Sequence, residues 1–146
     1  MSHFNKKENP YIVDVSKKKI TERTATAKGE VKFDTNSFRE IQSFKTKKGN
    51  IEKTAIIAGI LSAKETSKLI PLCHNIPINY IDIDIKKNIK DCLLIVECTV
   101  KANSNTGVEM EALTAVSISC LTIYDMCKYL NKKIEIQNIK LIKKTG

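Results

Sequence analysis

The stretch TGVEMEALTAVSISCLTIYDMCKYLNKK, residues 106–133, decides how the rest of the chain can fold. Thr106 is a good helix N-cap and Glu109 follows three residues later, so the pair predicts a capping box at the start of a long helix. Beyond Glu109 the residues are apolar on nearly every side of that helix. Because it has so little polar surface, we expect the helix to be buried in the protein or in an assembly.

Two charged residues, Asp125 and Lys128, interrupt this apolar run near its end. They are three residues apart, so their side chains can meet on one face of the helix. Burying a carboxylate costs several kcal/mol unless it is paired, and an ion pair between the two is therefore predicted. Physics alone leaves two interpretations open: a structural ion pair near a helix end, or an acid–base pair that does chemistry.

On either side of this helix the sequence alternates apolar and polar residues. Ile81, Ile83 and Ile85 alternate with charged residues, which is typical of a strand with one face in the core and one in solvent. The strands predicted in this part of the chain are residues 77–87, 92–102 and 134–143, with a turn at 88–91 and a polar loop at 103–105.

The first half of the chain is less regular. Residues 20–33 favour a strand in which Gly29 predicts a bulge or bend. A short helix is expected from Asp34 or Thr35 to Phe44, followed by a basic loop over residues 45–50. Residues 11–15 are a further short strand candidate.

A longer helix, capped by Asn50, is predicted to run to about Leu69 and to end before Pro71. It has two distinct faces. One is an apolar stripe made of Ile56, Ile57, Ile60 and Leu61. The other is a face of small residues that allows close packing, made of Ala55, Gly59, Ser62 and Ala63.

The major elements read β, α, β, β, α, β between residues 20 and 143. This order predicts an α+β fold of the ferredoxin-like, split βαβ type: one antiparallel sheet with helices on one face. A chain of 146 residues suits one domain. We expect a single α+β domain over residues 11–146 and a mobile N-terminal segment, residues 1–10.

The formal charge of +9 suits two kinds of partner, a nucleic acid or a small phosphate ester. Aromatic residues make up only 5% of the chain and there is no tryptophan, which disfavours an RNA-binding sheet. We therefore expect a small-molecule phosphate ligand rather than nucleic acid. Because no Gly-rich phosphate loop occurs, side chains would have to bind it.

Five scattered cysteines without a Cys-x-x-Cys spacing indicate free thiols in a reducing compartment. Residues 1–10 lack the apolar region of a secretory signal, and no charge-free apolar run is long enough to span a membrane. We expect a cytoplasmic protein without a membrane partner. With only two histidines, His3 and His74, no metal site and no cofactor are predicted.

Three segments resemble the signatures of one family, the molybdenum cofactor biosynthesis protein C or cyclic pyranopterin monophosphate synthase family. They are LIPLCH at residues 69–74, GVEMEA at 107–112 and LTIYDMCK at 121–128. Three blocks in the right order are far more specific than one short motif. The resemblance extends from about residue 13 to residue 144.

The resemblance implies a lyase, a cyclic pyranopterin monophosphate synthase that acts without a cofactor in molybdenum cofactor biosynthesis. Such an enzyme converts a cyclic dihydro-GTP intermediate to cyclic pyranopterin monophosphate and releases pyrophosphate. The substrate is then a small nucleotide, and residues 11–146 are the catalytic domain. The resemblance also implies a homohexamer built as a trimer of dimers.

The resemblance further implies the site residues. Asp125 and Lys128 are expected to do the acid–base chemistry, with Asp125 held ionised by pairing and Lys128 given a lowered pKa by burial. The expected substrate-binding residues are Leu72, Cys73, His74, Met110, Glu111, Glu109, Lys48, Arg23, Lys18 and Lys144.

Some of these residues admit other interpretations. Glu109 has a structural role if the capping box forms, whereas the carboxylate of Glu111 suits the paired N–H donors of a guanine or pterin ring. A Cys73–His74 nucleophilic pair is disfavoured because neighbouring side chains on an extended chain point in opposite directions. The family usually has proline after this histidine, and here Asn75 stands in its place.

Helix geometry adds an inference about assembly. Glu111 and Asp125 are 14 residues apart, which on one straight helix is roughly 21 Å along the axis. One compact site cannot easily use both, so we expect the site to lie between subunits. Two rival hypotheses are a small basic RNA-binding or regulatory module, and a purely structural oligomer in which the Asp125–Lys128 pair is inert.

Overall fold

Within the described residues, 3–130 and 133–146, the computed structural model has a four-stranded sheet, a two-stranded hairpin and four helices. In chain order the elements are β1 (Thr21–Lys32), α1 (Thr35–Glu40), β2 (Lys45–Thr46), β3 (Gly49–Asn50), α2 (Ile51–Lys64), α3 (Thr66–Leu69), β4 (Tyr80–Asn88), β5 (Leu93–Ser104), α4 (Glu109–Cys127) and β6 (Glu135–Thr145).

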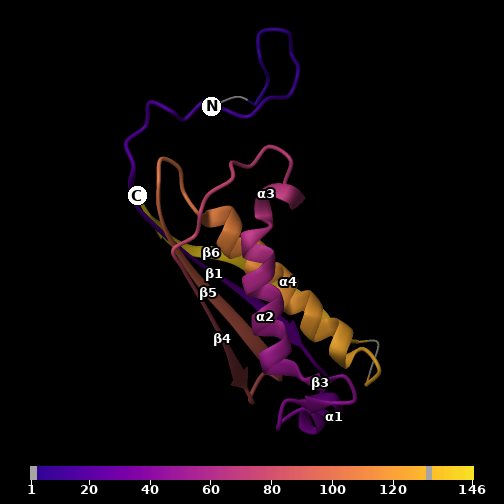
Figure 1. Ribbon diagram of the computed structural model, residues 1–146. Helices are drawn as coiled ribbons and strands as arrows, with labels where there is room; N and C mark the ends of the chain where they lie inside the picture. Colours follow the sequence, from indigo (N-terminus) through magenta and orange to yellow (C-terminus); the bar gives the residue numbers. More distant parts are fainter. Residues whose placement is uncertain (1–2, 131–132) are drawn as a thin grey trace.

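The large sheet has the strand order β4-β5-β1-β6, and every neighbouring pair is antiparallel. The connections from β1 to β4 and from β5 to β6 each skip one strand and pass through a helix, which is the split βαβ arrangement. The long helices α2 and α4 lie on the same face of the sheet (Figure 1). The predicted α+β, ferredoxin-like class is therefore confirmed.

Strand β1 is irregular where it passes beneath α4. Its pairing register with β6 shifts between Lys28 and Glu30, so the bulge predicted at Gly29 is confirmed. A Cβ on Gly29 would lie 2.6 Å from Val116 Cγ1 and 3.1 Å from Cys120 Sγ. Only glycine therefore allows β1 and α4 to approach so closely.

Helix α2 packs on α4 through its small residues, as the sequence predicts. Asn50 caps α2, because its side chain accepts a hydrogen bond of 2.8 Å from the N–H of Lys53. A Cβ on Gly59 would collide with the hydroxyl of Ser119 and lie 3.2 Å from the carbonyl oxygen of Ala115. The two helices are thus in near contact at Gly59.

The apolar stripe of α2 does not face this contact. The side chains of Ile57 and Leu61 are 58% and 57% exposed, while Ile56 and Ile60 are partly buried. Leu121 on α4 is 54% exposed as well. The two long helices therefore present apolar surface that this single chain leaves uncovered.

The start of α4 differs from the prediction. The capping box is wrong: the N-cap is Val108, and no side chain in the described part of the chain caps the helix. The N–H of Thr106 instead donates to the hydroxyl of Ser104 (3.2 Å), and the Glu109 carboxylate accepts from Lys144 (3.1 Å). The Thr106 N–H and the Glu109 carboxylate, which would bond to each other in a capping box, thus have other partners.

Other boundaries also shift. Helix α4 ends at Cys127 rather than near residue 133, and residues 131–132 of that prediction lie outside the described residues. The helix predicted from Asn50 to Leu69 is interrupted at Glu65, and β5 continues to Ser104 through most of the predicted loop. The loop predicted at residues 45–50 contains the β2–β3 hairpin.

Residues 11–15 do not form the predicted strand. Their carbonyl groups bond to side chains instead of a neighbouring strand: Val13 accepts from His74 and Val15 from Asn105 (3.0 Å). Before them, residues 4 and 10 form an isolated bridge. The mobility of residues 1–10 stays a prediction, and residues 1–2 lie outside the described part of the chain.

By length and composition alone, α4 could cross a membrane, since it is 19 residues long and its mean hydropathy is 1.2 over a window of 18 residues. Half of that window is buried inside the molecule, where α4 packs against the sheet and α2. The apolar residues of α4 thus serve as the core of the domain.

Candidate active site

The predicted site residues gather at opposite ends of α4. The carboxyl-end cluster consists of Lys48, Asp125 and Lys128. The amino-end cluster lies around a pocket at the start of α4 and consists of Arg23, Leu72, Cys73, His74, Glu109, Met110, Glu111 and Lys144. The remaining residue, Lys18, belongs to neither cluster and lies in a turn in which its N–H donates to the carbonyl of Val15 (3.0 Å).

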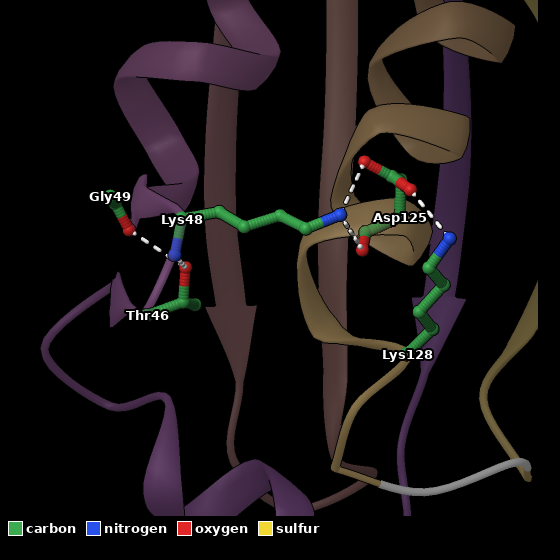
Figure 2. Close-up of polar contacts among 5 residues, drawn as sticks. All are labelled: Thr46, Lys48, Gly49, Asp125 and Lys128. Atoms are coloured by element: carbon green, nitrogen blue, oxygen red, sulfur yellow. Dashed lines mark hydrogen bonds and ion pairs between the residues drawn. The ribbon is translucent and has the colours of Figure 1, made fainter.

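Asp125 is the centre of the carboxyl-end cluster, between two lysines (Figure 2). Its Oδ2 is 3.0 Å from Nζ of Lys48, and its Oδ1 is 2.9 Å from Nζ of Lys128. Lys48 also donates to the backbone carbonyl of Asp125 (3.3 Å). The predicted Asp125–Lys128 pair is confirmed, and Lys48, 77 residues away in the sequence, joins it.

The β2–β3 hairpin holds Lys48 in place. The hydroxyl of Thr46 accepts the N–H of Lys48 (3.1 Å) and donates to the carbonyl of Gly49 (2.9 Å). Gly49 has a φ of +111°, which side chains other than that of glycine rarely allow. This tight turn directs the Lys48 side chain across to the last turn of α4 (Figure 2).

The expected burial of this ion pair is wrong. The side chains of Asp125 and Lys128 are 54% and 57% exposed, because α4 ends at Cys127 and leaves its last turn at the surface of the chain. Hydrogen bonds from Lys128 and then Lys48 lower the pKa of Asp125, so its ionised state is as predicted.

The pKa expected for Lys128 is also wrong in direction. Its hydrogen bond to Asp125, followed by the charge of Asp125, raises the pKa of Lys128 instead of lowering it. In this state Lys128 keeps its proton and cannot act as a base. The cluster can therefore supply two ammonium groups and one fixed carboxylate to a ligand.

The amino-end cluster borders a pocket of about 420 Å³. Leu72, Cys73 and His74 line one wall from the segment that follows α3, and Glu109 and Met110 line another from the first turn of α4. The structure thus brings together residues that are more than 30 positions apart, as the resemblance implies.

His74 is oriented by the N-terminal segment. Its Nε2 contacts the carbonyl oxygen of Val13, and a carbonyl can only accept, so Nε2 carries a proton. Nδ1 is then the ring atom left for a ligand. Sequence reasoning missed Val13, Val15 and Asn105 as parts of this arrangement, because backbone carbonyl acceptors have no sequence signature.

Cys73 does not behave as an activated nucleophile. Burial is the main cause that raises the pKa of its thiol, and the charges of Glu111 and Glu109 raise it further. The Cys73 thiol contacts the carbonyl of His74, not its ring (3.6 Å). Both observations agree with the expectation that these two residues are not a catalytic pair.

Glu109 is the anionic centre of this end of the site. Burial raises its pKa, but hydrogen bonds from its own N–H and from Lys144, together with the charges of Lys144 and Arg23, outweigh this and leave the pKa lowered. Arg23 is held nearby, since its Nε donates to the carbonyl of Ser104 (3.1 Å).

Glu111 is the buried carboxyl of the site, with only 2% of its surface exposed. Burial is the main cause that raises its pKa to about 7, and the neighbouring charge of Glu109 adds to it. Among the described residues, no group bonds to its Oε1. An unpaired buried oxygen costs stability, so this atom needs a partner that the described residues do not supply.

Glu111 should make the stability of the protein fall as pH rises. Its ordinary pKa is 4.5 and its folded value about 7, so between these values the folded chain binds more protons than the unfolded chain. At about pH 8 the loss approaches 3 kcal/mol. Urea unfolding at about pH 5 and pH 8 should show this loss in the parent and much less of it in Glu111→Gln. Equal pH dependence in both proteins would contradict the assignment.

Known proteins resemble this chain over nearly its whole length. The model of the MoaC family matches residues 12–146. A protein of Parvibaculum lavamentivorans named cyclic pyranopterin monophosphate synthase is 46% identical over 146 residues, which are 100% of this chain and 91% of that protein. Proteins with the same name from Clostridium botulinum and Campylobacter jejuni are 48% and 45% identical and are covered over 91% and 93% of their lengths. The chain belongs to the MoaC family.

Proposed function

We propose that this protein is a lyase, a cyclic pyranopterin monophosphate synthase, and that its active site is shared between two subunits. Its substrate would be the cyclic dihydro-GTP intermediate, and its products cyclic pyranopterin monophosphate and pyrophosphate. Membership of the MoaC family supports the activity, as do relatives of that name that the chain covers almost entirely. The observation behind the shared site is that the two clusters lie at opposite ends of α4.

In this proposal the amino-end cluster binds the substrate. The pocket takes the pterin and sugar portions, with Glu109 in its lining and Glu111 buried beside it as the proposed acceptors of ring N–H groups. Leu72, Cys73 and Met110 form its walls, and Nδ1 of His74, the ring nitrogen that Val13 does not occupy, would bind a ligand group. Four positively charged side chains would bind the phosphates. Arg23 and Lys144 belong to the amino-end cluster, Lys48 belongs to the carboxyl-end cluster, and Lys18 lies outside both.

The carboxyl-end cluster would perform the proton transfers. Lys128 is positively charged and donates, while Asp125 holds it and Lys48 in place through one carboxylate. An ammonium so placed can protonate an oxygen or nitrogen that leaves during rearrangement. The same positive charges stabilise the negative charge that develops as pyrophosphate departs.

Two observations support an assembly that joins the clusters of different copies. Along α4, Glu111 and Asp125 are roughly 21 Å apart, too far for one compact site. Ile57, Leu61 and Leu121 leave apolar surface uncovered on α2 and α4, which suits contact with another copy. We propose a homohexamer, a trimer of dimers, in which the amino-end cluster of one subunit faces the carboxyl-end cluster of the next.

The proposal also includes the cellular setting, the cytoplasm, with neither nucleic acid nor membrane as a partner. All five cysteines are free and three of them are buried, which suits a reducing compartment. The RNA-binding alternative has no support from aromatic residues on the sheet, where β4 and β5 offer only Tyr80.

The direct test is turnover. Purified protein would be incubated with the cyclic dihydro-GTP intermediate, and both pyrophosphate and the fluorescent oxidised pterin would be measured. We expect both products to appear in equal amounts. Polyanion binding with steep salt dependence and no turnover, from a protein of intact oligomeric mass, would favour the RNA-binding alternative and overturn the proposal.

A further inference from the structure

The face of the sheet opposite α2 and α4 has a hollow of about 340 Å³ at the end of β1 nearest Arg23. Two neighbouring rungs of the sheet form its floor. The β1 residues Thr24 and Thr26 lie between partners on β5 and on β6. The first rung is Lys101–Thr24–Thr145 and the second is Thr99–Thr26–Lys143. We call these six residues the threonine hollow.

The two lysines occupy diagonally opposite corners of the threonine hollow. Neighbouring strands are about 4.8 Å apart and residues two apart on a strand are about 7 Å apart, so the lysine Cα atoms are about 12 Å apart. Each four-carbon stem is long enough to bring its ammonium group over the threonine floor. A ligand above Thr24 and Thr26 can therefore be held from both sides at once.

The hydroxyl groups of the floor are arranged as donors. The Oγ1 atoms of Thr26 and Thr99 are 2.9 Å apart, and Thr26 is only 2% exposed. One proton makes the bond between the two hydroxyls, so the second is available to donate to a ligand. A polar pair buried at the bottom of a hollow with lysines at its corners is suited to an anion.

The charges around the threonine hollow favour the same ligand. Among the described residues, no carboxylate forms an ion pair with Lys101 or Lys143, although Glu22, Asp82 and Glu97 stand next to the hollow on this face. The ammonium group of Lys101 lies 5.2 Å from the ring centroid of Tyr80 on β4, a cation–π contact that is weak at an exposed site.

We propose that the threonine hollow binds a phosphate-class anion, and that inorganic pyrophosphate is its best match. Two ammonium groups and threonine hydroxyls offer charge and donors to several phosphate oxygens at once. Lys144 also borders the hollow and reaches Glu109 of the amino-end cluster (3.1 Å), so the hollow adjoins the candidate active site. The choice of pyrophosphate rests on the proposed function, whereas the binding of a phosphate-class anion does not.

The test is a titration of intact protein with inorganic pyrophosphate, followed by NMR of ¹³C-labelled threonine methyl groups. In the parent, the signals of Thr26 and Thr99 should shift and saturate. In the double variant Lys101→Gln/Lys143→Gln, saturation should need about tenfold more pyrophosphate, because two charge-assisted contacts are lost. Initial rates of turnover should be unchanged, since neither lysine belongs to the two clusters.

A matched control lies on the same sheet face. Lys28 and Lys140 are cross-strand partners outside the threonine hollow, and Lys28→Gln/Lys140→Gln removes the same charge. This control should bind pyrophosphate within about twofold of the parent. If both double variants weaken binding equally, only net charge matters and the proposal is overturned. It is also overturned if the parent signals do not shift, or if the hollow variant loses turnover.

A substitute variant and a second ligand complete the titration experiment. Single Lys143→Gln replaces the double variant if the latter fails to fold, with an expected loss of several-fold. Titration with orthophosphate separates a general phosphate site from one that prefers pyrophosphate, and equal affinity would overturn the preference for pyrophosphate. Saturable shifts in a parent protein that shows no turnover would support the threonine hollow while the proposed function fails.

Discussion

Asp125→Asn is expected to lower kcat by about 10³-fold and to leave the fold intact. Asparagine has the same shape, but it carries no negative charge to hold the ammonium groups of Lys48 and Lys128 together. The ordered positions of both donors would be lost, and with them the proton transfer. Turnover of the cyclic dihydro-GTP intermediate measures the loss, and circular dichroism with the oligomeric mass checks the fold.

The chain offers a matched control for this substitution. Glu65 and Lys68 form an ion pair with the same spacing and the same 2.9 Å contact, and neither residue belongs to either cluster. Glu65→Gln removes an equivalent surface pair and should leave kcat within about twofold of the parent. Parent-like turnover in Asp125→Asn would remove Asp125 from the chemistry, and an equal loss in both variants would point to a general charge effect.

Gly59→Ala is expected to destabilise the protein by about 2 kcal/mol. This is the reverse of the usual effect, because alanine in a helix interior is normally favoured over glycine by about 1 kcal/mol. The new methyl group would meet Ser119, the side chain of Ile83 (2.5 Å) and the carbonyl oxygen of Ala115 (3.2 Å). Urea unfolding of the two proteins measures the difference.

A double-mutant cycle with Ser119→Ala tests whether the clash with the Ser119 hydroxyl causes the loss of stability in Gly59→Ala. The Ser119 hydroxyl donates to the carbonyl of Ala55 (2.8 Å), so its removal alone also costs stability. If the hydroxyl is one of the clashing groups, the double variant should be more stable than the sum of the single effects predicts. Additive effects would assign the cost to the contacts with Ile83 and the Ala115 carbonyl, and a stabilised Gly59→Ala would contradict the packing of α2 on α4.

Much of the fold follows from local signals in the sequence. The alternation of Ile81, Ile83 and Ile85 determines both a strand and its buried face, and it needs no knowledge of distant residues. The Asn50 cap is local as well. The capping box of Thr106 and Glu109 was predicted on the same grounds and is wrong. The Thr106 N–H bonds to Ser104 instead, and the Glu109 carboxylate bonds to Lys144. A partner 35 residues away cannot be read from a four-residue motif.

The candidate site was predictable only where it depends on residues close together in the sequence. The Asp125–Lys128 pair depends on helix spacing alone, whereas Lys48 reaches Asp125 only because the β2–β3 hairpin and α4 meet in space. The exposure of Asp125 depends on where α4 ends, and helix ends are the least certain feature of a sequence pattern. The roles of all these residues in the reaction stay predictions.

The shared site is the central claim, and subunit complementation tests it most directly. Asp125→Asn damages the carboxyl-end cluster and Glu111→Gln the amino-end cluster, and each variant alone is expected to have almost no turnover. The two variants would be produced together, and mass spectrometry would confirm that mixed oligomers form.

If each site takes Glu111 from one subunit and Asp125 from another, random mixing leaves about one site in four with both residues intact. The account therefore predicts that the mixture regains about a quarter of the parent turnover per subunit. Mixed oligomers that stay as inactive as the separate variants would contradict it, because every site would then draw both residues from the same chain.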